Sequence, residues 1–129
     1  MLKSNPPPVS VIMPTFNSAK YLATAIGSIL DQTFKNFEFI IIDDGSTDST
    51  GKIIKRFSQK DKRIIIIKNK INLGIIKSLN KGIEKSKGEY IARMDSDDWS
   101  YPDRLGKQIS FMKKHPDVVI CGGKINICD

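Results

Sequence analysis

Five short apolar runs along the chain predict five β-strands. The runs are rich in β-branched residues, and most of them end at Pro, Asn, Asp or Gly, as buried strands commonly do. Polar residues hardly alternate with apolar ones inside them, so we expect both faces of each strand to be covered. The predicted strands lie in VSVIMPTFN at 9–17, FEFIII at 37–42, RIIIIK at 63–68, EYIARM at 89–94 and DVVICGG at 117–123.

The segments between these runs carry apolar residues at intervals of three and four, which is the pattern of an amphipathic helix. Helix signals flank them: Asn17 or Ser18 as an N-cap, Gly88 as a stop and Pro102 in a first turn. The expected buried positions are Leu22, Ala25, Ile26, Ile29 and Leu30 in the first helix, Ile53, Ile54 and Phe57 in the second, Ile76, Leu79 and Ile83 in the third, and Leu105, Ile109 and Met112 in the fourth.

The strict alternation of strand and helix predicts the fold class. Parallel strands need crossover connections, and a helix after each strand supplies them. We therefore predict an α/β domain with a mostly parallel, Rossmann-like sheet of about five strands and helices on both faces. The domain is expected to cover residues 9–129 after a Pro-rich lead-in at 1–8, because 129 residues suffice for one core.

Composition indicates a soluble globular chain, with 40% hydrophobic and 27% charged residues. The start, MLKSNPPPVS, has no apolar run long enough for a signal peptide, and no later stretch approaches the roughly 18 uninterrupted apolar residues of a membrane helix. Cys121 and Cys128 have no His or Cys partner at metal-binding spacing, which favours reduced thiols in a reducing compartment. The expected location is the cytoplasm, with membrane association at its inner face left open.

The formal charge of +7 comes from one part of the chain. Residues 52–87 contain 12 basic and 2 acidic residues, whereas the remainder is slightly acidic. This segment could contact an anionic membrane or a phosphorylated substrate, although an ordinary lysine-rich surface is the simpler interpretation. No aromatic residues interleave with the lysines as platforms for bases, so no nucleic-acid partner is predicted.

Polar residues follow the predicted strands, at the sheet edge where α/β proteins bind ligands. They are Pro14-Thr15-Phe16-Asn17, Asp43-Asp44-Gly45-Ser46, Asn72-Leu73-Gly74 and Asp95-Ser96-Asp97-Asp98. Each cluster alone is explained by turns and helix caps. However, two strands that each bring at least two carboxylates to one edge exceed what capping needs.

Asp95 and Asp97 form an Asp-X-Asp pair that is suited to Mg²⁺ or Mn²⁺, which take one or two carboxylates together with water and phosphate oxygens. The segment does not fit a calcium-binding EF-hand loop, because Ser100 and Gly106 stand where Gly and Glu are required. Asp98 is assigned to the turn before the next helix. Glycine-rich phosphate motifs are absent, so phosphate would be held mainly through the metal.

These residues together resemble the family-2 glycosyltransferases, inverting enzymes of the GT-A fold. The resemblance lies in VSVIMPTFN, SILDQTFKNFEFIIIDDGSTDST, NLGIIKSLNKGI, GEYIARMDSDDWSYPDRL and DVVICGG, which follow the family pattern in order and spacing. It implies a nucleotide-diphosphate sugar donor, a UDP-sugar above all, with Mn²⁺ or Mg²⁺. It also implies transfer to a hydroxyl acceptor that could be lipid-linked, in polysaccharide, cell-envelope or glycolipid synthesis.

The same resemblance assigns site residues. Pro14 and Thr15 would line the nucleotide pocket, and Asp44 with Asp43 beside it would face the base. Gly74 and Ser96 are also expected at the substrate. Asp95 and Asp97 would hold the metal, with Asp97 as the direct ligand.

Two departures from the family pattern stand out. Leu79 occupies a position where many relatives carry Arg, and nearby Lys77 could contact phosphate instead or simply face solvent. The general base and most of the acceptor site are expected beyond Asp129, so we expect the donor-binding half of a longer enzyme, which could be inactive alone.

Two other classes of protein remain open. A receiver-type phosphoacceptor domain has a similar length and alternation, but its acidic residues follow the first and third strands. Here they follow the second and fourth. A binding-only module that docks on a membrane or nucleic acid through residues 52–87 is the other alternative.

Overall fold

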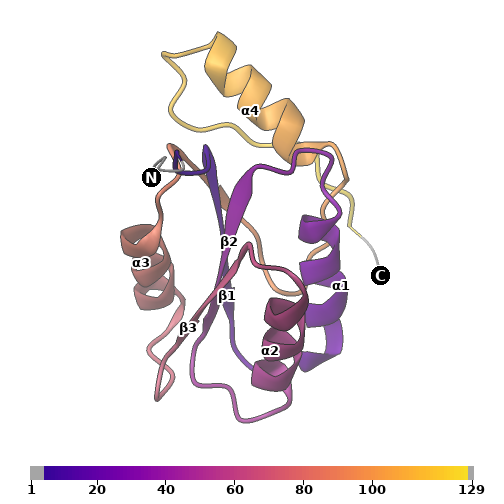
Figure 1. The fold of residues 1–129 in the computed structure, drawn as a ribbon, viewed down its shortest axis with the longest axis vertical. Coiled ribbons are helices and arrows are strands. Elements are labelled where there is room, and N and C mark those ends of the chain that lie inside the picture. Colours follow the sequence, from indigo (N-terminus) through magenta and orange to yellow (C-terminus); the bar gives the residue numbers. More distant parts are fainter. Residues whose placement is uncertain (1–4, 128–129) are drawn as a thin grey trace.

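The chain folds around one parallel β-sheet. The computed structural model describes residues 5–127, so the first part of the predicted lead-in and Cys128 lie outside the described residues. The sheet has four strands in the order β3-β2-β1-β4, all parallel (Figure 1). The elements are β1 (Val9–Thr15), α1 (Ala19–Leu30), β2 (Phe37–Asp43), α2 (Thr50–Lys60), β3 (Ile64–Lys68), α3 (Ile75–Lys85), β4 (Tyr90–Arg93) and α4 (Arg104–Lys114).

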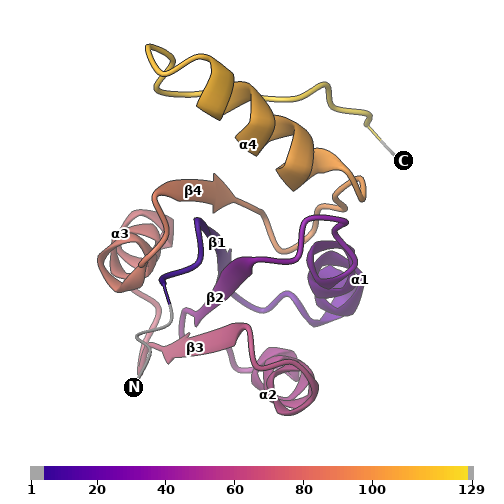
Figure 2. The same ribbon diagram turned by 45° about the horizontal axis from the view of Figure 1, so that its top comes forward.

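Helices cover both faces of this sheet, as predicted. Figure 2 shows α1 and α2 on one side and α3 on the other. The larger core lies on the α1 side, where Leu22, Ile26 and Ile29 are fully buried. A smaller cluster on the α3 side contains Ile12 and Ile40, with Leu79 packed against them. The α/β fold class and the parallel sheet are therefore confirmed.

The third helix does not bury the face that its apolar pattern predicts. Ser78 and Gly82 are the buried residues of α3, and a Cβ atom on Gly82 would lie 2.6 Å from Cγ2 of Ile12. These small residues let α3 approach the sheet closely. As a result, Ile76 and Ile83 remain exposed although they belong to the same apolar stripe as Leu79.

The predicted fifth strand, DVVICGG at 117–123, is wrong. This segment has no strand structure, and Val119 and Ile120 are 86% and 84% exposed. A strand requires the edge of a neighbouring strand for its hydrogen bonds, but the segment turns back beside α4 instead (Figure 2). The amide of Asn126 donates to the Tyr101 hydroxyl at 2.6 Å in the same region. The described sheet therefore has four strands rather than five.

The expectation that both faces of every strand are covered fails at β3. This strand pairs only with β2 and so forms one edge of the sheet. Ile64 is buried, whereas Ile66 is 41% exposed and Lys68 is also exposed. A run of isoleucines does not reveal from sequence whether a strand lies at the centre of a sheet or at its edge.

Gly27 offers a site for stabilisation in α1. A Cβ atom placed there meets no atom within 4 Å, so alanine fits without a clash. Because glycine inside a helix costs about 0.5–1 kcal/mol relative to alanine, Gly27→Ala should raise the free energy of unfolding by that amount. Urea denaturation checks this prediction, and an unchanged or lower midpoint would contradict it.

Candidate functional site

The first two strands end side by side at the predicted site. Thr15 at the end of β1 is in register with Asp43 at the end of β2. The Thr15 hydroxyl donates to the Ile42 carbonyl at 3.0 Å, and Asp44 N–H donates to the Thr15 carbonyl at 2.8 Å. Pro14 is half-buried one residue earlier. The polar ends of β1 and β2 are therefore joined into one rigid edge.

Asn17 connects the loop after β1 to the loop after β2. Its backbone has a φ angle of 46°, which Asn tolerates better than most residues. Its side-chain oxygen accepts from Thr47 N–H at 2.9 Å, and its own N–H donates to the Ser46 hydroxyl at 3.0 Å. The sequence predicted a helix cap at Asn17 or Ser18. Ser18 takes the N-cap position without a capping bond, and the bridging role of Asn17 was missed.

Asp43 is buried and shapes the turn that precedes α2. Its Oδ1 atom accepts from Ser46 N–H at 3.0 Å, which is the bond of an Asx-type turn. The Oδ2 atom lies close to Gly51, in the first turn of α2. This carboxylate thus has a structural task, in addition to the substrate contact that the resemblance implies.

Asp44 is also buried, and it anchors the connection between β3 and α3. Its carboxylate accepts hydrogen bonds from Leu73 N–H at 2.8 Å, Gly74 N–H at 2.9 Å and the Asn69 amide at 2.8 Å. Asn69 in turn accepts from Lys81 Nζ at 2.7 Å. The sequence predicted that Asp44 and Gly74 lie at the same end of the sheet, but the hydrogen bond from Gly74 N–H to the Asp44 carboxylate was not predicted.

The pKa of Asp44 follows from these contacts. Burial alone raises the pKa of this carboxyl, but hydrogen bonds from Leu73, Asn69, Gly74 and Ser78 together outweigh burial and bring the pKa below its usual value. The carboxylate is therefore ionised at neutral pH.

The acidic segment after β4 reaches the same edge through one contact. The hydroxyls of Ser96 and Ser18 lie 2.7 Å apart, which places Ser96 beside the start of α1. Asp95 forms an ion pair with Arg93 at 3.1 Å, whereas Asp97 is exposed and makes no ion pair among the described residues. The pairing of Arg93 with Asp95 was missed, although the spacing of two residues beside a strand end is compatible with it.

Three carboxylates crowd together in this segment. Burial raises the pKa of Asp98, the nearby Asp95 and Asp97 raise it further, and Arg104 opposes the shift. In residues 5–127, no three His, Cys, Asp or Glu side chains converge in an arrangement that would hold a metal ion. The donor set nevertheless suits Mg²⁺ or Mn²⁺, because these ions need only one or two carboxylates beside water and phosphate, and a cation would relieve the crowding.

Other features lie apart from the site. Leu79 packs against the cluster of Ile12, Ile40 and Ile42. Two surface hollows of about 460 and 310 Å³ lie along α4 and between α1 and Trp99, respectively, and neither is lined by a predicted site residue. No helix within 5–127 has the length and apolar character to cross a membrane.

Comparisons with known proteins identify the family of this chain. The family model for glycosyl transferase family 2 matches residues 10–129. The putative glycosyltransferase EpsE of Bacillus subtilis is 44% identical over 95% of this chain and 45% of its own length. The chain spans half or less of the length of the curated relatives it matches first.

Solved structures agree as well. S. aureus TarS in complex with UDP has a TM-score of 0.77 and 32% identity, over 84% of this chain and 32% of that one. A mannosyltransferase of Pyrobaculum calidifontis in complex with GDP-Man and Mn²⁺ has a TM-score of 0.76 at 24% identity, over 83% of this chain and 32% of that one, and shows the fold alone. These structures support the GT-A expectation. The chain belongs to glycosyl transferase family 2.

Proposed function

We propose that this chain is the donor-binding portion of an inverting, metal-dependent glycosyltransferase. The observation that carries the proposal is the meeting of three strand-end segments at one edge, where Ser18 contacts Ser96 and Asn17 binds Thr47. Such an edge is where α/β proteins hold nucleotides. TarS in complex with UDP is a 32% identical structural neighbour, which supports a UDP-sugar as the donor.

The residues at this edge have separate tasks in the proposed reaction. Asp97 and Asp95 would hold Mn²⁺ or Mg²⁺, which supplies charge neutralisation to the departing diphosphate. Pro14, Thr15 and the Asp44-anchored connection at Gly74 would enclose the nucleotide. With the donor so held, an acceptor hydroxyl attacks the sugar from the face opposite the diphosphate.

Completion of transfer needs a base to take the proton of the acceptor hydroxyl. We propose that this base lies in the part of the longer relatives that the chain does not match. A product in polysaccharide, cell-envelope or glycolipid synthesis and a cytoplasmic site of action belong to the same proposal. The family match leaves no observation that favours a receiver-type phosphoacceptor domain.

Donor binding is testable without turnover. UDP with Mn²⁺ should raise the melting temperature by roughly 5 °C at concentrations far above Kd, because a ligand stabilises only the folded state. Asp97→Ala should remove most of this rise. Differential scanning calorimetry with UDP, Mn²⁺ and both together measures it.

Asp31→Ala is the matched control, because Asp31 is an exposed residue at the opposite end of α1 from the site. The control should keep the full rise. An equal rise in the Asp97 variant would contradict the metal assignment, and no rise in the unmodified chain would contradict donor binding.

A further inference from the structure

Three exposed isoleucines lie within six positions, one in the connection between β3 and α3 and two in the first turn of α3. Ile71, Ile75 and Ile76 are 67%, 52% and 73% exposed. Single exposed apolar residues are ordinary, but three within six positions form a concentrated apolar surface. We call residues 68–77 the β3–α3 tip. It lies at the carboxyl ends of the strands, where the proposed donor site is also located (Figure 1).

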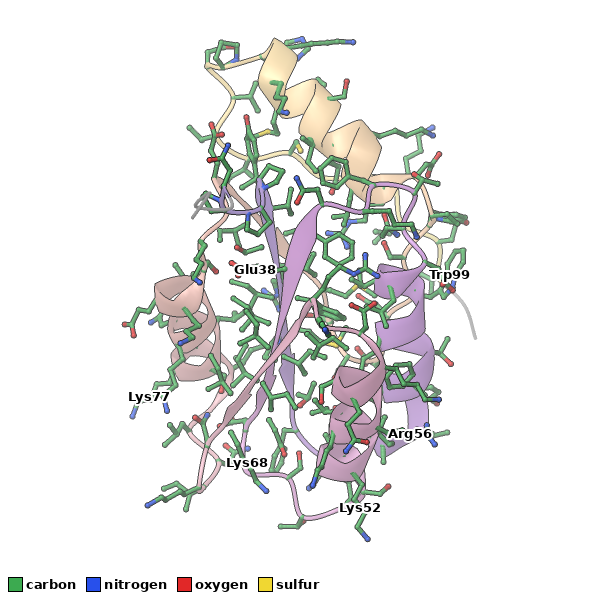
Figure 3. All side chains as sticks on the ribbon, in the orientation of Figure 1. Glu38, Lys52, Arg56, Lys68, Lys77 and Trp99 are labelled. Carbon is green, nitrogen blue, oxygen red and sulfur yellow. The ribbon has the colours of Figure 1, made fainter. Side chains whose placement is uncertain are left out.

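The tip is also strongly basic. Lys68, Lys70 and Lys77 are all exposed within it. Residues 62–83 contain no acidic residue at all. Figure 3 shows Lys68 and Lys77 at the same end of the molecule as Lys52 of α2. The lysines therefore border the apolar side chains with no negative charge between them in the sequence.

The buried Asp44, which follows β2, holds the backbone of the tip in place. Its carboxylate accepts hydrogen bonds from the amides of Leu73 and Gly74, which fixes the backbone in the middle of the tip. The anchor engages backbone amides only, and the isoleucines on either side of it are more than half exposed. A fixed backbone also means that little conformational entropy is lost when the tip binds a partner.

We infer that the β3–α3 tip inserts into the surface of an anionic lipid bilayer. Apolar side chains ringed by lysine are the chemistry of an interfacial membrane contact, in which isoleucine enters the headgroup boundary and lysine meets acidic lipid. The tip has no aromatic residue for stacking on bases, which disfavours nucleic acid. The contact does not depend on donor binding, although it would bring the proposed site to the surface where a lipid-linked acceptor resides.

Vesicle sedimentation tests this inference on the 129-residue chain without nucleotide. Vesicles with 30% phosphatidylglycerol should bind the chain, and pure phosphatidylcholine vesicles should bind it at least about tenfold more weakly. Combined Ile71→Ser, Ile75→Ser and Ile76→Ser should reduce the partition coefficient by about tenfold or more. Combined Lys68→Gln, Lys70→Gln and Lys77→Gln should do the same and remove most of the salt dependence.

Matched controls lie in α4, at the far end of the molecule from the tip (Figure 1), and in the segment that follows α4. Lys113, Lys114 and Lys124 changed to Gln remove the same charge, and Val119, Ile125 and Ile127 changed to Ser remove exposed apolar area. Both controls should bind like the unmodified chain. Equal loss in a control, or full binding in the isoleucine variant, would overturn the inference. Displacement from vesicles by a short oligonucleotide would also overturn it. Circular dichroism of each variant tests whether it is folded, and only folded variants are compared.

Discussion

Gly45→Ala is expected to lower the free energy of unfolding by about 4 kcal/mol, the largest effect of any single change considered for this chain. Gly45 has a φ angle of +74°, which costs roughly 1–2 kcal/mol for an L-residue with a Cβ atom. In addition, that Cβ atom would lie 2.6 Å from the carbonyl carbon of Ile71 and 2.7 Å from the nitrogen of Asn72. Both are backbone atoms, so relief requires the β3–α3 tip to move.

Gly74→Ala separates the cost of a positive φ angle from the cost of the close contact with the backbone of Ile71 and Asn72. Gly74 also has a positive φ angle, +90°, but a Cβ atom there meets nothing within 4 Å. Its ψ angle is 162°, a combination that is almost restricted to glycine, so the variant should cost about 1–3 kcal/mol from backbone strain alone. Urea denaturation of both variants measures the difference. Equal losses would show that the contact with Ile71 relaxes freely, contrary to the expected rigidity of the tip.

Asp44→Asn is expected to lower the free energy of unfolding by about 2–3 kcal/mol at pH 7, although the side chain keeps its shape. One oxygen of Asp44 accepts from Asn69 and Leu73, and the other accepts from Gly74. An asparagine amide in either orientation turns its NH₂ group toward an N–H donor. One buried donor at least therefore loses its partner.

The effect of Asp44→Asn should depend on pH in a defined direction. The folded state lowers the pKa of Asp44, so its carboxylate contributes stability that is present above the unfolded pKa of about 3.9. That contribution is lost as the pH falls through the lower folded pKa. The stability difference between the two proteins should thus be largest above about pH 5 and shrink in more acidic solution.

Urea denaturation from pH 2.5 to 7 checks this dependence, with Asp31→Asn as the control. Asp31 is exposed and should change stability by less than about 0.5 kcal/mol at any pH. If Asp44→Asn weakened donor binding while the unfolding midpoint stayed the same, Asp44 would contact the nucleotide without stabilising the β3–α3 tip.

The sequence predicted most of the fold because its strands are continuous apolar runs. The runs at 9–17 and 37–42 contain β1 and nearly all of β2, and every residue of these two strands except Pro14 is buried. The run at 117–123 has a similar composition but does not lie beside any strand with which it could pair. Composition does not reveal where a segment lies relative to the sheet. Similarly, the stripe of Ile76, Leu79 and Ile83 predicts α3 but not its orientation, which the small residues Ser78 and Gly82 determine.

The site was predictable to the extent that topology determines it. In a parallel sheet the carboxyl ends of all strands lie at one edge, so Thr15 and Asp43 had to meet there. The partners of Asp44 could not be predicted, because Leu73 and Gly74 bind it through backbone amides that every residue type except proline has. Whether Asp97 and Asp95 hold a metal remains a proposal, as do the roles of Pro14 and Ser96 toward a substrate.

The central place of β1 has a consequence for how this chain acquires its structure. The residues of β1 form ladders with β2 and with β4, and Val9 is in register with Tyr90. About 80 residues therefore separate the two partners, and no two of the four described strands form a hairpin. Folding that depends on such distant contacts is slow, because the chain loses the entropy of closing long loops before the hydrogen bonds of a strand pair can stabilise it. During synthesis, one side of β1 has to wait until α3 and β4 have emerged from the ribosome.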